Sequence, residues 1–310
     1  MEGAGGAGTS SPFCLPWARA MPMSAAMERP PTGTAITLSP LVRRVLAPNP
    51  SAFTYQGTQT YIVGHGEVAV IDPGPDLPEH LDALLAAVEG ETIKAIVCTH
   101  THRDHSPASR PLKAATGAAI IGCARLVLDD SGPRADAAFD TDYYPDSVLA
   151  DGDMLTGPGW TLQAVATPGH TSNHLCLSLP QEKALFTGDH IMGWSTTVVS
   201  PPDGDMADYM ASLDKLLRRD DVVYYPAHGD QVDTPQRLTR GMMGHRKQRE
   251  GQILRLLKQE PRAIPQMVEK MYVGLDPRLN GAAGRSVLAH LIDLRQRGVV
   301  REEGDTWRSA

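Results

Sequence analysis

Cysteine is scarce in this chain of 310 residues, and long hydrophobic runs are missing from it. The four cysteines lie far apart, and none belongs to a CxxC pair. This spacing argues against a disulfide framework and indicates a reducing compartment such as the cytoplasm. No stretch approaches the roughly 18 consecutive apolar residues that a membrane-spanning helix needs. We therefore expect no membrane span.

Basic residues are fewer than acidic ones. Lysine and arginine total 29 against 36 aspartates and glutamates, which gives a formal charge of -7. This balance argues against a protein that coats nucleic acid. The charge is uneven, however, because residues 235–310 hold 15 basic and 8 acidic side chains, whereas residues 1–234 hold 14 and 28. The asymmetry predicts two units of different character in one chain.

Composition and hydrophobic pattern divide the chain into three parts. Residues 1–33 are rich in Gly, Ala, Ser and Pro, which is typical of a disordered tail and a poor match to a signal peptide. Residues 34–234 alternate strand-like and helix-like segments, which predicts an α/β sandwich. Residues 235–310 read as three helices and a short strand pair, the outline of a small winged-helix-like domain.

Apolar runs and helical spacing predict the individual elements. In the sandwich, strands are expected at 52–63, 67–72, 93–98, 118–121, 160–166, 174–179, 184–187 and 222–225, and helices at 78–89 and 206–219. The turn at Gly64–Gly66 predicts a hairpin between the first two strands. Near the C-terminus, helices are expected at 246–259, 263–272 and 285–296, before a strand at 299–302.

The most informative segment follows the strand expected at 93–98. It reads Thr-His-Thr-His-Arg-Asp-His and holds four strong metal ligands within six positions, namely His100, His102, Asp104 and His105. Side chains two apart in an extended segment project to the same side, so His100 and His102 can share one ion while the other two turn toward a second. Imidazole and carboxylate together suit zinc, iron or manganese better than an ion that prefers thiolate.

Three later loops offer one ligand each. His170, Asp189 and His228 each come shortly after a predicted strand. Each alone is a weak signal, because a single His or Asp after a strand is usually a turn or cap residue. Together with the histidine-rich loop they place ligands after four strands, and the loops at strand ends are where α/β folds gather their sites.

The order HxHxDH, then His, Asp and His, resembles the metallo-β-lactamase superfamily and implies its αββα sandwich fold. The resemblance also implies two metal ions, zinc in the first place, with one shared ligand. The ligands would be His100, His102 and His170 for one ion, Asp104, His105 and His228 for the other, and Asp189 as the bridge. Asp104 is in addition the candidate catalytic residue.

Two further residues are expected behind the ligands. Asp72 lies in an Ile-Asp-Pro-Gly turn typical of the superfamily and would orient the ligand loop by hydrogen bonding, with a plain Asx turn as an equal alternative. His190 would donate a hydrogen bond or protonate the leaving group, although packing is the commoner role for such a residue. Tyr143 and Trp194 lie in loops that are expected to border a substrate pocket.

These ligands predict a hydrolase in which a hydroxide held by two metals attacks a small carbonyl substrate: an ester, thioester, lactone or lactam. The acidic sandwich does not favour a polyanionic substrate. A mononuclear iron sulfur dioxygenase is an alternative, because a similar His-rich loop serves that chemistry. A transcription regulator is the least favoured reading, since a sensor would not need a complete ligand set. The sequence is also compatible with a homo-oligomer.

A single-strand RNA endonuclease is the other alternative. The segments 188–198 and 245–250 resemble the lactamase-like endoribonucleases of mitochondria. Contacts to RNA phosphates would come from Arg246, Lys247, Arg249 and Arg255. The same basic helix is slightly better explained as a solvated face or as a surface that docks onto the acidic sandwich.

Overall fold

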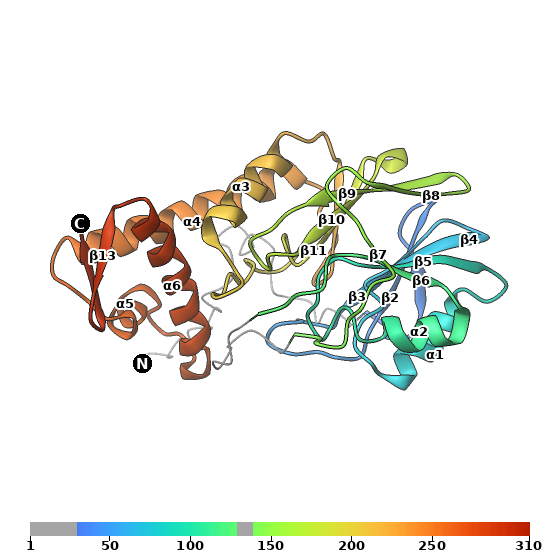
Figure 1. The fold of residues 1–310 in the computed structure, drawn as a ribbon, viewed down its shortest axis with the longest axis horizontal. Helices are drawn as coiled ribbons and strands as arrows, with labels where there is room; N and C mark the ends of the chain where they lie inside the picture. Colours follow the sequence, from blue (N-terminus) through green and yellow to red (C-terminus); the bar gives the residue numbers. More distant parts are fainter. Residues whose placement is uncertain (1–29, 129–138) are drawn as a thin grey trace, which may run out of the picture.

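The structure is a computed structural model that describes residues 30–128 and 139–310. Two sheets pack face to face with helices on both outer sides, and a small helical unit with a strand pair follows (Figure 1). The αββα sandwich and the winged-helix-like end are thus confirmed. Residues 1–29 of the expected tail lie outside the described residues, whereas Gly33 N donates a hydrogen bond to Leu46 O at 3.1 Å.

The first sheet has seven strands that neighbour one another in chain order. They are β1 (Ala35–Thr37), β2 (Val42–Leu46), β3 (Gln59–Val63), β4 (Glu67–Ile71), β5 (Thr92–Cys98), β6 (Ala119–Gly122) and β7 (Ser147–Val148). The predicted hairpin around Gly64–Gly66 is present, because β3 and β4 pair antiparallel. The strand expected from residue 52 is wrong up to residue 58, where the chain turns: Tyr55 and Gly57 have φ values of 57° and 138°, which a strand does not tolerate.

The second sheet has the order β12-β11-β10-β9-β8. Its strands are β8 (Met154–Gly157), β9 (Trp160–Ala166), β10 (Leu175–Leu179), β11 (Ala184–Gly188) and β12 (Val223–Pro226). Alternating residues of each strand fill the core between the sheets. On β4, Ala69 and Ile71 pack toward β11 residues such as Phe186, whereas Val68 and Val70 face the helices on the outer side.

Helices cover both outer faces of the sandwich (Figure 1). α1 (Pro78–Ala87) and α2 (Ser109–Thr116) bury Leu84 and Leu112 against the first sheet. α3 (Met206–Leu217) buries Tyr209 and Leu213 against the second sheet. Because each helix buries one apolar side, the two sheets are shielded and their strand ends are held in fixed positions.

The C-terminal part begins with a helix longer than predicted. Its elements are α4 (Pro235–Leu257), α5 (Ile264–Met271), α6 (Asn280–Gln296), β13 (Val300–Glu303) and β14 (Thr306–Ser309). Leu238 and Met242 of α4 pack into the core of the second sheet, while Ile253 and Leu257 of the same helix pack into the C-terminal core. One continuous helix therefore joins the two units, and the domain boundary at residue 235 stays a prediction.

Within residues 30–128 and 139–310, none of the helices combines the length and the apolarity that crossing a bilayer requires. The cysteines in this part of the chain, Cys98, Cys123 and Cys176, are buried and free. Burial in the core explains their presence without a disulfide or a thiolate site.

Candidate metal centre

All seven predicted ligands lie on loops that follow strands. His100, His102, Asp104 and His105 come after β5 of the first sheet, whereas His170, Asp189 and His228 come after β9, β11 and β12 of the second sheet. The structure brings these side chains together into two adjoining groups. The loops of both sheets thus converge on a single place, as their positions at the strand ends predicted.

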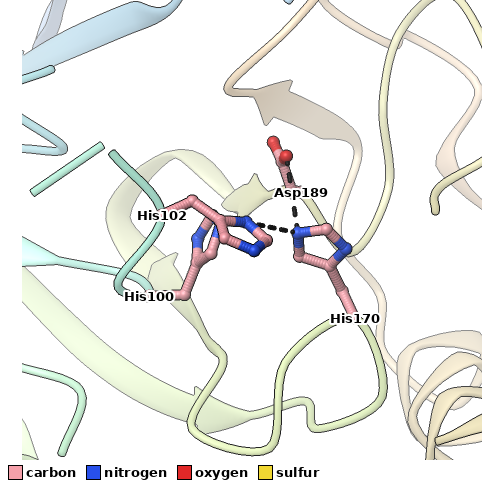
Figure 2. A group of neighbouring side chains, drawn as sticks. All are labelled: His100, His102, His170 and Asp189. Carbon is pink, nitrogen blue, oxygen red and sulfur yellow. Dashed lines mark hydrogen bonds and ion pairs between the residues drawn. The ribbon is translucent and has the colours of Figure 1, made fainter. Parts of the chain in front are cut away.

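The first group consists of His100, His102, His170 and Asp189, all buried, with their potential ligand atoms within 4.8 Å of one another (Figure 2). His102 Nδ1 lies 2.9 Å from His100 Nε2 and 3.0 Å from His170 Nε2. His170 Nδ1 donates to Val198 O at 2.7 Å, which leaves a lone pair on its Nε2 in the neutral ring. The nitrogen atoms therefore converge on one point, as ligands of a cation do.

The tautomer of His100 leads to the same conclusion. Thr99 Oγ1 donates to Asp72 Oδ2 at 2.8 Å and so accepts from His100 Nδ1 at 3.0 Å. The lone pair of His100 then resides on Nε2, which points toward the other nitrogen atoms of the group. Two lone pairs aimed at the same imidazole nitrogen cannot both be satisfied by its single proton, whereas an ion between them would satisfy both.

The second group consists of Asp104, His105 and His228. Asp104 Oδ2 lies 3.1 Å from His228 Nε2 and 3.4 Å from His105 Nε2. Asp189 stands between the groups: its Oδ1 is 3.3 Å from His228 Nε2, and its Oδ2 is 3.6 Å from His170 Nε2. One carboxylate thus presents one oxygen atom to each group, which is the position that a bridging ligand requires.

The spacing of the donor atoms fits divalent ions. Zinc holds nitrogen and oxygen ligands at about 2.0–2.2 Å, so two ligands of a tetrahedral ion lie about 3.3 Å apart. The donor distances given above, from 2.9 to 3.6 Å, bracket that value. Moreover, Asp189 Oδ1 and His105 Nε2 are buried and make no hydrogen bond. Such atoms are costly to bury unless they bind something.

The electrostatics of the side chains are dominated by the two carboxylates. Burial would raise the pKa of Asp189, but His228 and His105 outweigh burial and hold that pKa well below its usual range. Burial would likewise lower the pKa of His228, yet Asp189 and Asp104 raise it to about 10. In the first group, burial and the neighbouring His170 lower the pKa of His102 to about 3. Metal binds neutral imidazole and ionised carboxylate, so His102 and Asp189 are already in the binding form at pH 7, whereas an ion at the second group must displace the proton of His228.

Asp72 supports the histidine-rich loop from behind. It is 2% exposed, and it accepts hydrogen bonds from Thr99 N at 2.8 Å and from His105 Nδ1 at 3.0 Å. The second contact places the lone pair of His105 on Nε2, toward Asp104 and Asp189. The backbone φ of Asp72 is 47°, a conformation that Asp tolerates better than most residues. The contacts are those expected of an orienting residue.

The sequence assigns no role to His174, but its side chain contacts the first donor group from the protein interior. Its Nε2 accepts a hydrogen bond from Asp189 N at 3.2 Å, and its Nδ1 lies 2.9 Å from Thr167 Oγ1. A Cβ on Gly188, which has a φ of 47°, would lie 2.7 Å from His174 Nε2, so glycine is required there. His174 therefore fixes the backbone of Asp189. Its place just before β10, four residues after His170, is the signal that could have revealed it.

His190 differs from its neighbour Asp189, because it belongs to neither donor group. The ring is completely buried and packs against Tyr209, with the ring centroids 4.8 Å apart. Neither ring nitrogen has a hydrogen-bond partner. The contacts of His190 are thus those of a packing residue, the alternative that its position in the sequence also allowed.

A pocket of about 340 Å³ opens over both groups. The predicted ligands that line it are His102, Asp104, His170, Asp189 and His228. Most of the remaining lining is apolar and comes from Ala52, Phe53, Tyr55, Met192, Trp194, Val198, Leu279 and Ala282. Tyr55 and Trp194 stack with ring centroids 4.9 Å apart. The expectation for Trp194 holds, but that for Tyr143 is wrong, because its side chain is fully buried in the core under α1 and α2.

Two protein-family models match this chain. The model of the Metallo-beta-lactamase superfamily matches residues 53–228, more than half of the chain, and that of the Beta-lactamase associated winged helix domain matches residues 263–307. The chain therefore belongs to the metallo-β-lactamase superfamily and carries the associated winged helix domain.

Individual relatives cover most of the chain. A Beta-lactamase-like protein 2 homolog of Caenorhabditis elegans is 35% identical over 226 residues, which is 72% of each chain. An Atrochrysone carboxyl ACP thioesterase of Aspergillus fumigatus is 35% identical over 261 residues, which is 82% of this chain and 74% of the relative. The crystal structure of a Beta-lactamase domain protein from Burkholderia ambifaria is 19% identical and has a TM-score of 0.77, with 96% of this chain and 97% of that chain covered. That structure shares the fold.

The raised pKa of His228 leads to a testable dependence on pH. Because its pKa in the folded chain is about 10 and the ordinary value is 6.5, its ion pairs stabilise the metal-stripped chain fully below pH 6.5. This stabilisation is lost as the pH rises through about 10. We expect the Tm of the stripped chain to fall between pH 7 and 10 by a few °C more than that of the zinc-loaded chain.

The matched control for this prediction is stripped His228→Gln, which should lose the part of the additional fall that His228 contributes, because glutamine cannot titrate; the part that remains comes from His105, whose pKa Asp104 and Asp189 also raise against the effect of burial. Thermal unfolding followed by circular dichroism measures all three samples. Equal falls in the stripped and zinc-loaded chains would contradict the placement of His228 beside the two carboxylates.

Proposed function

We propose that the chain is a metal-dependent hydrolase of small carbonyl substrates, above all thioesters or esters whose acyl group is apolar. The cofactors would be two divalent metal ions per chain, most plainly zinc, with iron or manganese as alternatives. The observation that carries this proposal is the single apolar pocket that opens over both donor groups. Transfer of an apolar acyl chain from water into this pocket is favourable in free energy, and the carbonyl group of that chain then lies next to the predicted metal ligands.

Each residue has a task in this proposal. His100, His102 and His170 would hold one ion, Asp104, His105 and His228 would hold the other, and Asp189 would bridge them. Ions held at these places would supply Lewis acidity and would lower the pKa of a bound water molecule. Asp104 acts as a ligand that stays ionised, since its histidine neighbours outweigh burial and keep its pKa well below the usual range. Phe53, Trp194 and Leu279 enclose the acyl group and exclude water.

The relatives support a thioester as the substrate. A protein 35% identical to this chain bears the name of an acyl carrier protein thioesterase, and a second of that name, from Cryptosporiopsis, is 32% identical. Both a thioester and an ester present a planar carbonyl carbon to a nucleophile, so one site geometry serves both. The excess of acid over base in residues 1–234 also favours such substrates over a polyanion.

Two alternatives lose support. The prediction that Arg246 contacts RNA phosphates is wrong, because this side chain is 3% exposed and donates to Thr197 O within the protein. Lys247 and Arg255 are exposed but do not line the pocket over the metal groups. A mononuclear dioxygenase would need one donor group only, whereas Asp104, His105 and His228 form a second.

A substrate panel tests the proposal. The zinc-loaded chain is offered an ester, a thioester, a lactone, a β-lactam and single-stranded RNA under the same conditions. We expect the highest kcat/KM for the thioester or the ester. Cleavage of RNA without hydrolysis of any carbonyl substrate would refute the proposal.

The aromatic wall of the pocket is expected to select for acyl length. Trp194→Ala removes an aromatic surface from the wall and the stacking partner of Tyr55. Because contact with such a ring contributes about 1.5 kcal/mol or more, kcat/KM for an octanoyl thioester should fall at least about tenfold, mainly through KM. The acetyl thioester is the control and should change by less than about threefold, since it does not reach the wall. Equal losses for both would contradict the placement of the acyl chain.

A further inference from the structure

A second, smaller cavity lies next to the pocket, where α4 and α6 meet the sandwich. Its volume is about 20 Å³. Its lining from the C-terminal part includes Arg246 and Arg249 of α4 and Ser286 of α6, and we call it the arginine cavity. Thr196, Val198 and Ala282 line both this cavity and the larger pocket, so the two spaces adjoin at these residues.

Neither arginine has an acidic partner. Arg246 is 3% exposed, donates to Thr197 O and Ser286 Oγ, lies over the Tyr209 ring, and leaves its buried Nε without a hydrogen bond. Arg249 is half-buried, donates to Met271 O at 3.1 Å and to Gln252 Oε1 at 3.0 Å, lies over the Tyr272 ring, and has an unbonded Nε. In the part of the chain that the structure describes, neither forms an ion pair with a carboxylate. Arg246 is thus a buried cation without a counter-ion, which is costly, and an anion between it and the half-buried Arg249 would lower that cost.

The neighbouring histidines do not provide a counter-charge. His245 lines the cavity, and burial together with Arg246 and Arg249 lowers its pKa to about 3. His290 is 2% exposed, both of its ring nitrogens are unbonded, and burial followed by Arg246 lowers its pKa to about 3 as well. Both rings are therefore neutral at pH 7, and the surroundings of the cavity are positive.

The segment Thr196–Val198, where the two spaces adjoin, is hydrogen-bonded to the metal centre. Thr197 accepts a hydrogen bond from Arg246 through its carbonyl group, and it donates from Oγ1 to Asp189 O at 2.8 Å. Val198 O accepts from His170 Nδ1 at 2.7 Å. A single segment thus contacts an arginine on one side and two predicted metal ligands on the other. A ligand that fills both spaces would have one end at the metal centre and the other at the arginines.

We propose that the arginine cavity binds a carboxylate at the far end of the acyl group, so that the preferred substrate is the monothioester or monoester of a dicarboxylic acid. This inference rests on the proposed function. The small volume admits a compact end group and excludes a phosphodiester chain. A guanidinium holds a carboxylate through two parallel hydrogen bonds, which explains why arginine and not lysine lines the cavity. The apolar pocket holds the methylene groups between the two ends.

The test compares glutaryl and pentanoyl thioesters of one thiol, which have five-carbon acyl groups and differ in the terminal carboxylate. For the unaltered zinc-loaded chain, kcat/KM should be at least about tenfold higher for the glutaryl thioester, through a lower KM. Arg249→Gln should abolish this preference and leave pentanoyl hydrolysis within about twofold. Arg249→Lys, which keeps the charge, should retain part of the preference. Arg255→Gln, on the exposed side of the same helix, should retain all of it.

Three results would overturn this inference: equal kcat/KM values for both thioesters in the unaltered chain, a preference that survives Arg249→Gln, or an equal loss for both thioesters in that variant. The comparison in the unaltered chain decides even if Arg249→Gln does not fold. Hydrolysis of the pentanoyl thioester reports on the proposed function separately. Turnover without a preference would refute the carboxylate site alone, whereas no turnover of either thioester would refute the hydrolase itself.

Discussion

Replacing Asp189 with alanine should lower kcat for thioester hydrolysis at least about a thousandfold and reduce the bound zinc from two ions per chain to one or fewer. Asp189 has one oxygen atom 3.3 Å from His228 Nε2 and the other 3.6 Å from His170 Nε2, so its loss deprives both donor groups at once. It also leaves five imidazole rings around the site with one carboxylate, Asp104, to offset the charge of two ions. A thousandfold loss corresponds to about 4 kcal/mol in the activation barrier.

The matched control for Asp189→Ala is Asp221→Asn. Asp221 is also a buried carboxylate, but it pairs with Arg219 at 2.7 Å and belongs to neither donor group. This control should keep two zinc ions and most of the activity, although its stability will fall. Kinetics and elemental analysis of the folded variants measure both effects. An Asp189→Ala chain that keeps two ions and turns over normally would show that this carboxylate is no bridge.

Replacing Asp72 with asparagine should weaken zinc binding at the second donor group about tenfold to a hundredfold. The reason is the tautomer of His105, whose Nδ1 donates to Asp72 Oδ2 at 3.0 Å. Asparagine can still accept from Thr99 N through its carbonyl oxygen, but its amide group then faces His105 Nδ1 and donates to it. His105 must then carry its proton on Nε2, the atom that would bind the ion.

The Asp72→Asn variant separates orientation from folding. Asparagine has nearly the same size as aspartate and tolerates the positive φ of this position, so the turn should be kept. Competition with a chromogenic chelator gives the two zinc affinities, and the first should fall as well, because Thr99 Oγ1 loses its acceptor Asp72 Oδ2 and no longer accepts from His100 Nδ1. Unchanged affinity for both ions would reduce Asp72 to an ordinary turn residue, the alternative that its sequence context allowed.

Local patterns predicted which side chains come together, because the candidate ligands are concentrated in short segments. His100, His102, Asp104 and His105 lie within six positions after an apolar strand, and a strand fixes where its own end lies. The sandwich was predictable for the same reason, since short continuous apolar runs indicate strands that are buried on both faces. The family resemblance then supplied the pairing of loops that lie far apart in the chain.

Features that depend on contacts between distant segments were not predictable. The turn around Tyr55, the stacking of Tyr55 on Trp194 and the contribution of Leu279 to the pocket arise only when three remote segments meet. The place of His174 four residues after His170 hints at a role near the ligands, but its bond to Asp189 joins two separate loops and shows only in the fold. Arg246 lies in a run of basic residues that reads as a solvated surface, and only the packing of α4 against the sandwich shows that it is buried.

The central claim is that two ions, held by the two donor groups, are needed for hydrolysis in the apolar pocket. The most direct test is a zinc titration of the chelator-stripped chain, with thioester hydrolysis and bound metal measured on the same samples. We expect activity to rise mainly between the first and the second equivalent of zinc and to level off at two ions per chain. Full turnover with one ion bound would contradict the claim.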